Sequence, residues 1–223
     1  MANTARINGL SPVRYLSGAP YNGAANKYAV PTSDTTASYA IGDVVMSAGS
    51  SDDNGVLYVK KIPVANASNF VALGVVVGVL PVEAGLSLVG SNLDLSQLYI
   101  PDGTRTVVKY VLVADDPNLV FEASAGTTAT NFTQAKTRYN CGICSNTGSD
   151  VTYDISQGTL SQTAPLSNVV LSSATVATTN TLPIQLLGLA QYQDNTFGAY
   201  ARMLCRFNSH ELGVATGTNF TGL

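Results

Sequence analysis

The side chains that could do covalent or metal chemistry are few in this chain of 223 residues. A Ser-His-Asp or Cys-His site would have to use the one histidine, His210. His210 follows the last predicted strand, so we expect it to be a surface or interface side chain. The sequence holds no Walker loop, no G-x-G-x-x-G and no H-E-x-x-H. These observations predict that the protein is not an enzyme.

Cysteines provide the next candidate site. Cys141 and Cys144 match the C-x-x-C spacing, and Cys205 is the third cysteine. Without a second cysteine pair or a nearby histidine, the spacing gives at most half of a zinc site. It also lacks the βαβ pattern of a redox motif, and an odd number of cysteines argues against a disulfide framework. We predict free thiols, with a disulfide or metal pair as the alternative, and we expect no cofactor and no metal.

Neighbouring carboxylates occur at Asp115-Asp116 and in the segment Asp52-Asp53-Asn54. Adjacent side chains on a strand diverge, so Asp115 and Asp116 are better suited to a turn that bonds back to its own backbone. The second segment lacks the ligand spacing and closing glutamate of an EF-hand. We predict a solvated turn at 52–54 and a turn with side chains bonded to the backbone at Asp115-Asp116.

The composition predicts the fold class. Charged residues make up only 11% of the chain, whereas hydrophobic residues make up 45%, and there are three glutamates. Ordinary soluble domains carry roughly 25% charged residues. Helices need Glu, Lys and Arg on their wet faces, so helices must be few. The prediction is a mostly β protein, a β-barrel or jelly-roll-like sandwich, with one mildly helical stretch at 132–138.

Net charge and hydropathy exclude two classes of partner. The net charge of −3 argues against a dedicated nucleic-acid binder, which would carry a basic stripe. The first residues lack the apolar core of a signal peptide, and the longest apolar run is too short to cross a membrane. We therefore expect synthesis in a cytoplasm, with no nucleic-acid partner and no membrane partner. The neutral surface of Ser, Thr and Asn suits a packed assembly, although secreted β proteins share it.

Residues 70–81 form the strongest predicted strand. With a period of two, bulky side chains fall on one face and small ones on the other. The bulky face carries Val71, Leu73, Val75, Val77 and Val79, and the small face carries Ala72, Gly74, Val76 and Gly78. We expect the bulky face in the main core and a close backbone approach at the glycines. Further strands are predicted at 39–46, 56–62, 106–114, 119–122, 151–155, 169–171, 183–190 and 200–207, with hairpins at Asn54-Gly55 and at 115–118. In the last of them one face carries Ala201, Met203, Cys205 and Phe207 and the other Arg202 and Arg206, which predicts a half-buried strand with Cys205 in the core.

Residues 1–31 contain no acid and are interrupted by turn dipeptides. They are predicted to form an extended arm, with apolar anchors that include Leu10, Val13, Tyr15 and Tyr21. The arm is either strapped to its own domain, extended to a neighbouring subunit or partner, or disordered. The predicted organisation is an arm at 1–31, a β-barrel or jelly-roll body at 32–212 and a flexible tail at 213–223.

Several segments together resemble a family of virion structural proteins, the head cement or decoration proteins of tailed bacteriophages. They are RINGLSPVRYLSGAPYNG at 6–23, YAIGDVV at 39–45, ALGVVVG at 72–78, VLVADDP at 111–117, LLGL at 186–189 and FNSH at 207–210. The resemblance covers most of the chain in order and is weakest over 124–181. None of these segments is catalytic.

The resemblance implies a protein made in the bacterial host cytoplasm that binds the capsid exterior of the virion and clamps neighbouring capsid subunits. Its implied partners are the major capsid protein and itself, as a homo-oligomer in which a trimer is favoured over a dimer. The arm could bind in a partner's groove by strand addition. The residues expected to contact a partner are Arg6, Leu10, Val13, Arg14, Tyr15 and Tyr21. Two alternatives remain, a tail-fibre or adhesin-like module that binds host-surface glycans and a small hydrolase that depends on His210.

Overall fold

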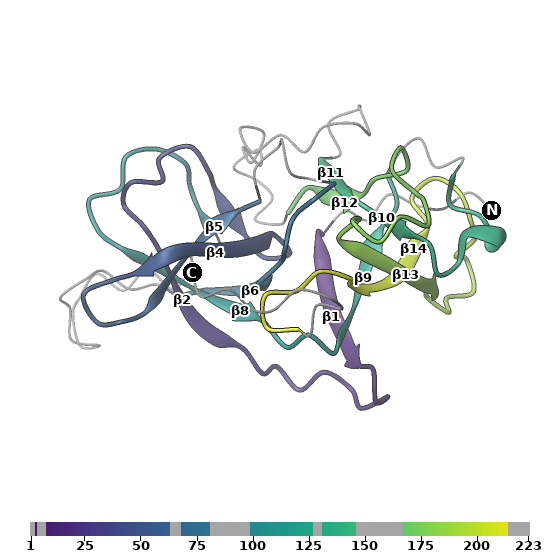
Figure 1. Ribbon diagram of the computed structural model, residues 1–223, viewed down its shortest axis with the longest axis horizontal. Helices are drawn as coiled ribbons and strands as arrows, with labels where there is room; N and C mark the ends of the chain where they lie inside the picture. Colours follow the sequence, from purple (N-terminus) through teal and green to yellow (C-terminus); the bar gives the residue numbers. More distant parts are fainter. Residues whose placement is uncertain are drawn as a thin grey trace.

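The computed structural model describes residues 3, 8–62, 68–80, 99–126, 131–145 and 167–213. Most of the ordered elements are short β-strands, so the prediction of a mostly β protein is confirmed. The predicted helical stretch at 132–138 contains only a single 3-10 turn, η3 at Gln134–Lys136. The strands fall into two lobes, a barrel and an open sheet (Figure 1).

The first lobe is a closed five-stranded barrel with the order β2-β5-β4-β6-β8. Its strands are β2 (Asn26–Val30), β4 (Val44–Ser51), β5 (Leu57–Lys61), β6 (Gly74–Leu80) and β8 (Lys109–Ala114). Apolar side chains fill the interior, among them Tyr39, Val45, Val59, Val76 and Val111. β2 and β5 close the barrel as a parallel pair, with Ala29 opposite Tyr58.

The second lobe is an antiparallel sheet of five strands with the order β1-β9-β14-β13-β10, called the open sheet below. Its strands are β1 (Leu10–Tyr15), β9 (Leu119–Ser124), β10 (Asn140–Cys141), β13 (Ile184–Leu189) and β14 (Arg202–Phe207). Two small sheets complete the fold, β3 (Tyr39–Ala40) with β7 (Tyr99–Ile100) and β11 (Ile143–Ser145) with β12 (Val169–Leu171).

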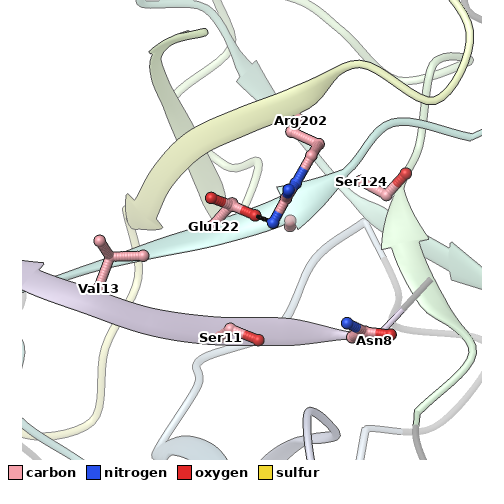
Figure 2. Close-up of a pocket in the computed structure, with 8 residues that line it drawn as sticks. Asn8, Ser11, Val13, Glu122, Ser124 and Arg202 are labelled. Carbon is pink, nitrogen blue, oxygen red and sulfur yellow. Dashed lines mark hydrogen bonds and ion pairs between the residues drawn. The ribbon is translucent and has the colours of Figure 1, made fainter. Parts of the chain in front are cut away.

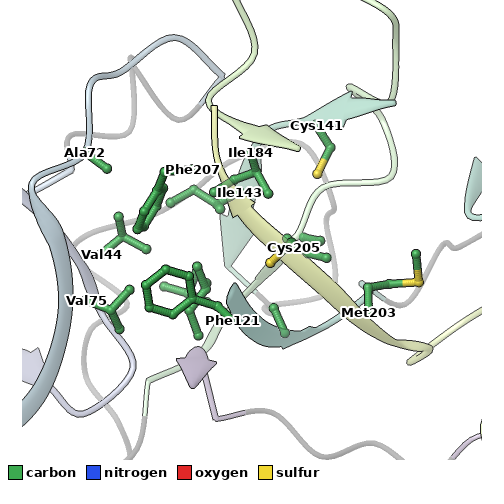
Figure 3. Close-up of a cluster of buried hydrophobic side chains, with 14 of the residues drawn as sticks. Val44, Ala72, Val75, Phe121, Cys141, Ile143, Ile184, Met203, Cys205 and Phe207 are labelled. Carbon is green, nitrogen blue, oxygen red and sulfur yellow. The ribbon is translucent and has the colours of Figure 1, made fainter. Parts of the chain in front are cut away.

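A shared hydrophobic core joins the two lobes. Val44 and Val75 from the barrel pack in one cluster with Phe121 and Phe207 from the open sheet (Figure 3). The Phe121 and Phe207 rings meet edge to face, with centroids 5.1 Å apart. Because β8 lies in the barrel and β9 in the open sheet, residues 115–118 carry the chain from one lobe to the other. The predicted hairpin at this turn is therefore wrong.

The hairpin predicted at Asn54-Gly55 is confirmed. β4 and β5 pair antiparallel on either side of it, with Ser51 opposite Leu57. Gly55 has a φ of 78°, a backbone conformation that favours glycine. Oδ1 of Asp52 accepts the N–H groups of Asn54 and Val56, at 2.9 and 2.8 Å. This carboxylate fixes the turn as an Asx motif does.

Strand β6 serves both cores, which corrects the expected assignment of its faces. Val75 lies in the shared core, whereas Val76 and Leu73 lie in the barrel interior. Val71 precedes the strand and is 47% exposed. A register shift between Val76 and Gly78 changes the alternation within the strand, so a single bulky face does not exist.

The close approach expected at the small face is confirmed at Gly74. A Cβ atom at this position would lie 2.4 Å from the carbonyl oxygen of Ala114 on β8. Gly78 is less constrained, because its nearest neighbour would be a side-chain atom of Leu112 at 3.4 Å.

Much of the predicted arm belongs to the body of its own chain. β1 pairs with β9 at the edge of the open sheet, and β2 is a strand of the barrel. Pro12 lies in the edge strand, where the absence of an N–H group is tolerated. The segment after β1 folds back, since Tyr21 N–H donates to Val13 O at 3.0 Å and Tyr15 N–H donates to Ala19 O at 2.8 Å.

Some expectations fall outside the described residues. They include the strand predicted at 151–155, Pro81 at the end of the strand predicted at 70–81, and all but Gly213 of the predicted tail. The strand predicted at 169–171 coincides with β12 and is confirmed.

Candidate functional site

Regular alternation in β9 and β14 separates the core side of the open sheet from its opposite side. In β14, Met203, Cys205 and Phe207 are buried in the shared core. The side chains between them therefore point to the other side, and register extends the same division to β1, β9 and β13. We call this second side the outer face; its residues are Ser11, Arg14, Val120, Glu122, Ser124, Gln185, Arg202, Leu204 and Arg206.

The outer face is unusually rich in arginine for this chain. Arg14 lies opposite Val120, and Arg206 lies opposite Gln185, whose Oε1 accepts from Arg206 Nε at 2.8 Å. Three guanidinium groups against one carboxylate leave an excess of two positive charges. The chain as a whole has a net charge of −3, so this face has the opposite sign from the average.

Glu122 and Arg202 form the ion pair of the face (Figure 2). The hydroxyl of Tyr192 donates to Glu122 Oε2 at 2.7 Å, and the Arg202 guanidinium lies 4.4 Å from the centroid of the Tyr192 ring. The Glu122 carboxylate is thus held by two partners on neighbouring segments. The ion pair and the ring contact together position the Arg202 guanidinium on the face.

A hollow of about 200 Å³ lies beside this ion pair. Figure 2 shows Ser11 and Val13 of β1 on one side of the hollow and Glu122 and Arg202 on the other. Val13 is the extra residue at a register shift between Pro12 and Arg14, and its side chain is 41% exposed. The lining of the hollow combines hydroxyl groups, an amide, a guanidinium and a carboxylate with the apolar side chains of Val13 and Ala123. Such a lining suits a protruding polar side chain of a partner.

The structure places the six residues predicted to contact a partner in different environments. Leu10 is 1% exposed in the shared core, so its predicted role in a partner contact is corrected. Arg14 and Val13 are accessible at the outer face and the hollow. Tyr15 and Tyr21 lie near each other, with ring centroids 6.4 Å apart. Arg6 lies outside the described residues.

The strand addition expected for the arm takes place within the chain. β1 adds to β9, and its other edge is occupied by the segment that folds back from Ala19 to Tyr21. At its start, Leu10 N–H donates to the carbonyl oxygen of Gly42 at 3.0 Å. Side chains on the outer face, rather than the strand edge, are therefore what this part of the chain offers to a partner.

Sequence reasoning missed Glu122, Arg202 and Arg206 as site residues. The alternation in 200–207 put both arginines on one face, but nothing local placed Arg14 or Glu122 beside them. That juxtaposition depends on pairing between β1, β9 and β14, which are far apart in sequence.

His210 is buried, and the expected surface position is wrong. Its side chain is 7% exposed and lies beside Phe207, with ring centroids 5.8 Å apart. Leu212 N–H donates to Nδ1 at 3.1 Å, which leaves the proton on Nε2. In the described part of the chain Nε2 has no hydrogen-bond partner. Burial lowers the pKa of His210 to about 4, against the opposing effect of Asp115 and Asp116.

The buried histidine makes stability depend on pH. Because the pKa is about 4 in the folded state and 6.5 ordinarily, the unfolded chain binds the proton first as pH falls. The stability contributed by neutral His210 should be complete above about pH 6.5 and lost towards pH 4, a loss of about 2–3 kcal/mol. Urea unfolding at pH 7 and pH 4.5 measures it.

A His210→Gln variant is the control for this titration, because it cannot bind the proton. Its stability should change less between the two pH values than that of the natural chain. Glu211, whose pKa is raised by burial, acts in the opposite direction in both proteins. An equal loss in both would show that His210 is not the group responsible.

The cysteines are buried thiols and none of them forms a disulfide. Burial raises the pKa of Cys205 to about 12, with a further contribution from Glu122, and it raises the pKa of Cys141 well above its usual range. Such thiols are poor nucleophiles at neutral pH. Within the described ranges, no group of three or more His, Cys, Asp or Glu side chains could hold a metal ion.

Asp52, predicted in a solvated turn, is largely buried, which corrects that expectation, and Asp115 is buried as well. Asp115 is 7% exposed and accepts the Tyr28 hydroxyl at 2.6 Å, while Asp52 is 8% exposed and accepts the Tyr110 hydroxyl at 2.7 Å. The Asp115 bond contributes, after burial itself, to raising the pKa of Tyr28 above its usual range. Asp115, at the end of β8, therefore bonds to β2, and Asp52, at the end of β4, bonds to β8.

The fold and the site together define a two-lobed, mostly β protein whose open sheet bears an arginine-rich outer face. Among the described residues, no helix is both long enough and apolar enough to cross a membrane. Comparisons with protein-family models, curated proteins and solved structures give no match to this chain.

Proposed function

We propose that this chain is a virion structural protein of a tailed bacteriophage that binds the outer face of the capsid and cements neighbouring capsid subunits. The proposal begins from the segments that resemble head cement proteins. One structural observation carries it further, namely that several of these segments, far apart in sequence, meet where the two lobes join.

That meeting point is built from close backbone contacts. Leu10 N–H, from the segment at 6–23, donates to Gly42 O in the segment at 39–45. Gly42 N–H in turn donates to Val76 O in the segment at 72–78, at 2.8 Å. Ala72 forms a parallel bridge with His210, at the end of the segment at 207–210. The segments that carry the resemblance thus meet at one junction of this chain, an arrangement that would give each of them a structural role in the proposed family.

The glycines of this junction have a physical reason to be where they are. A Cβ atom on Gly9 would lie 2.2 Å from the carbonyl oxygen of Gly42, and a Cβ on Gly42 would lie 2.1 Å from the carbonyl oxygen of Asn8. Both glycines also have positive φ, 67° and 96°. Only glycine allows the two backbones to approach so closely.

The surface chemistry suits a cement protein. With 11% charged residues, contacts over a large area desolvate few charges. Modest contacts repeated over a closed shell add up through avidity, without a tight single site. A rigid two-lobed body with a shared core can span a subunit boundary without losing its own packing.

Purified protein added to emptied capsid shells that lack it should sediment with the shells and raise the temperature at which they break. The physical reason is that each bound copy links subunits that heat otherwise separates. Sedimentation and a thermal-release assay with an encapsulated dye measure the two effects, with serum albumin as a control. Protein that stays in the supernatant, and shells that break at the same temperature, would contradict the proposal.

The proposal includes self-association, in which a trimer is favoured over a dimer. The mass of the purified protein in solution, from light scattering, tests this part separately from shell binding.

An adhesin-like module is the second candidate, and one observation favours it. Tyr192 is 46% exposed and lies over Arg202 beside the polar hollow, an arrangement of aromatic ring and polar groups that also suits a sugar. Protein that binds host-cell polysaccharide and ignores shells would favour this candidate over the first.

A further inference from the structure

We infer that the outer face of the open sheet docks onto an acidic protein surface of the capsid shell, through Arg14 and Arg206 on either side of Val120. This inference rests on the proposed function and names the part of the molecule that carries it, together with the chemistry of the surface it meets.

The register of three strands brings the two arginines to Val120. Arg14 of β1 is paired directly opposite Val120 of β9. On the other side, β14 pairs with β9 up to Cys205 opposite Phe121, and Arg206 is the next residue along β14. Both guanidinium stems therefore flank a valine that is fully buried although it points away from the core. Arginine side chains in such positions can cover apolar surface with their stems while their charged ends stay in water.

Neither of the two arginines has a carboxylate partner within the part of the chain that the structure describes. Among the described residues, Arg202 is the only arginine of the face in an ion pair, the one with Glu122. The other two donate to described residues as follows: Arg14 Nη1 to Tyr15 O at 3.5 Å, and Arg206 Nε to Gln185 Oε1 at 2.8 Å. As far as the described residues go, most N–H groups of both guanidinium ends thus remain for a ligand, and bidentate bonding to carboxylates is what this group does best.

The rest of the face favours a protein surface over other anionic partners. On β14, Leu204 lies between Arg202 and Arg206. Val13, next to Arg14, is 41% exposed, so apolar contact area accompanies the charge. Interfaces between proteins combine arginine with apolar side chains in this way. A nucleic-acid face needs a longer basic stripe, and two uncompensated charges on a chain of net charge −3 do not form one.

Charge complementarity identifies the occupant as acidic. The excess of two positive charges on the outer face would repel a basic shell surface and attract carboxylates. The segment from Ala19 to Tyr21 bonds to Val13 and Tyr15 at the edge of β1 beside the face, so we assign the contact to side chains rather than to strand pairing.

The experiment compares three proteins for binding to emptied shells, to poly-L-glutamate and to a short DNA duplex. They are the natural chain, the double variant R14Q/R206Q and the control K27Q/K109Q, which removes the same charge from barrel strands β2 and β8. Thermal unfolding of each protein checks that it is folded, and the single variants R14Q and R206Q replace the double variant if that one is not.

The expected result is that R14Q/R206Q binds shells and poly-L-glutamate roughly tenfold more weakly at about 0.1 M salt, with a smaller salt dependence. The control should bind as the natural chain does. Equal shell binding by all three proteins would overturn the inference and leave the proposed function intact. If the natural chain ignores shells but binds poly-L-glutamate through these arginines, the proposed function fails while the outer face stands as a docking face for acidic partners. Tighter binding to DNA than to poly-L-glutamate would also overturn the inference.

Discussion

Replacing Asp43 by asparagine should lower the free energy of unfolding by about 3–5 kcal/mol, because it leaves the charge of Lys61 buried without its counter-ion. Lys61 Nζ lies 2.9 Å from Asp43 Oδ2, and the two side chains are 3% and 0% exposed. Urea unfolding at neutral pH, monitored by circular dichroism, measures the change. This effect should be the largest of any single substitution of a charged residue in the described chain.

The surroundings of Asp43 explain why the loss is large. Its Oδ2 also accepts Ala40 N–H at 2.8 Å, and its Oδ1 accepts the Ser167 hydroxyl at 2.5 Å. Ser167 N–H donates to Ile41 O at 3.0 Å, so the carboxylate ties the start of β4 to the segment before β12. An asparagine presents one acceptor oxygen and an NH₂ group, which cannot satisfy Lys61, Ala40 and Ser167 together.

Two further variants make the result specific. Asp53→Asn makes the same chemical change in the exposed part of the neighbouring turn and should shift stability by less than about 0.5 kcal/mol. Replacing the pair together, with Asp43→Leu and Lys61→Met, should restore part of the loss, because no unpaired charge remains. If Asp43→Asn and Asp53→Asn had the same effect, the buried ion pair would not have the role assigned to it.

Replacing Leu10 by alanine should lower the free energy of unfolding by about 2–5 kcal/mol. Leu10 is 1% exposed and packs in the core shared by both lobes, so its loss leaves a cavity there. Chemical unfolding of the variant measures the effect.

Val13→Ala is the matched control, since it lies three residues along the same strand. With its side chain 41% exposed, this change should alter stability by about 0.5 kcal/mol or less. Little effect from Leu10→Ala would mean that β1 is an arm detached from the body in solution, contrary to the pairing with β9. The same pairing means that removing residues 1–25 would destabilise the open sheet, so shell-binding tests need point variants rather than truncation.

Local patterns predicted those elements whose causes are local. The alternation in 200–207 predicted β14 with Cys205 in the core, and Asn54-Gly55 predicted the β4–β5 hairpin. The scarcity of glutamate predicted a mostly β fold. Each of these depends on residues within a few positions of one another, which is why a single sequence was sufficient.

Long-range pairing decided the rest. The residues near Leu10 in the sequence do not show whether its side chain packs against a partner protein or in its own core. That depends on the pairing of Leu10 with Ala123 on β9. β6 contributes side chains to two cores because apolar layers lie on both of its sides. A strand with apolar residues on both faces gives no local sign of which side chain enters which core. The position of His210 after the last strand predicts a surface side chain, because nothing in the local sequence indicates the bridge to Ala72.

The candidate site was predicted in part for the same reason. Arg14 and Val13 were named from the arm, and Arg202 and Arg206 were assigned to one face of a strand. Their assembly on one sheet, with Glu122 between them, required the order β1-β9-β14.

An electron cryomicroscopy reconstruction of shells to which the protein has been added tests the central claim most directly. We predict density for a two-lobed body on the shell exterior, at a boundary between capsid subunits, with β1, β9 and β14 turned towards the shell and carboxylates opposite Arg14 and Arg206. Shells without added density, or a body that meets the shell through its barrel, would contradict the account.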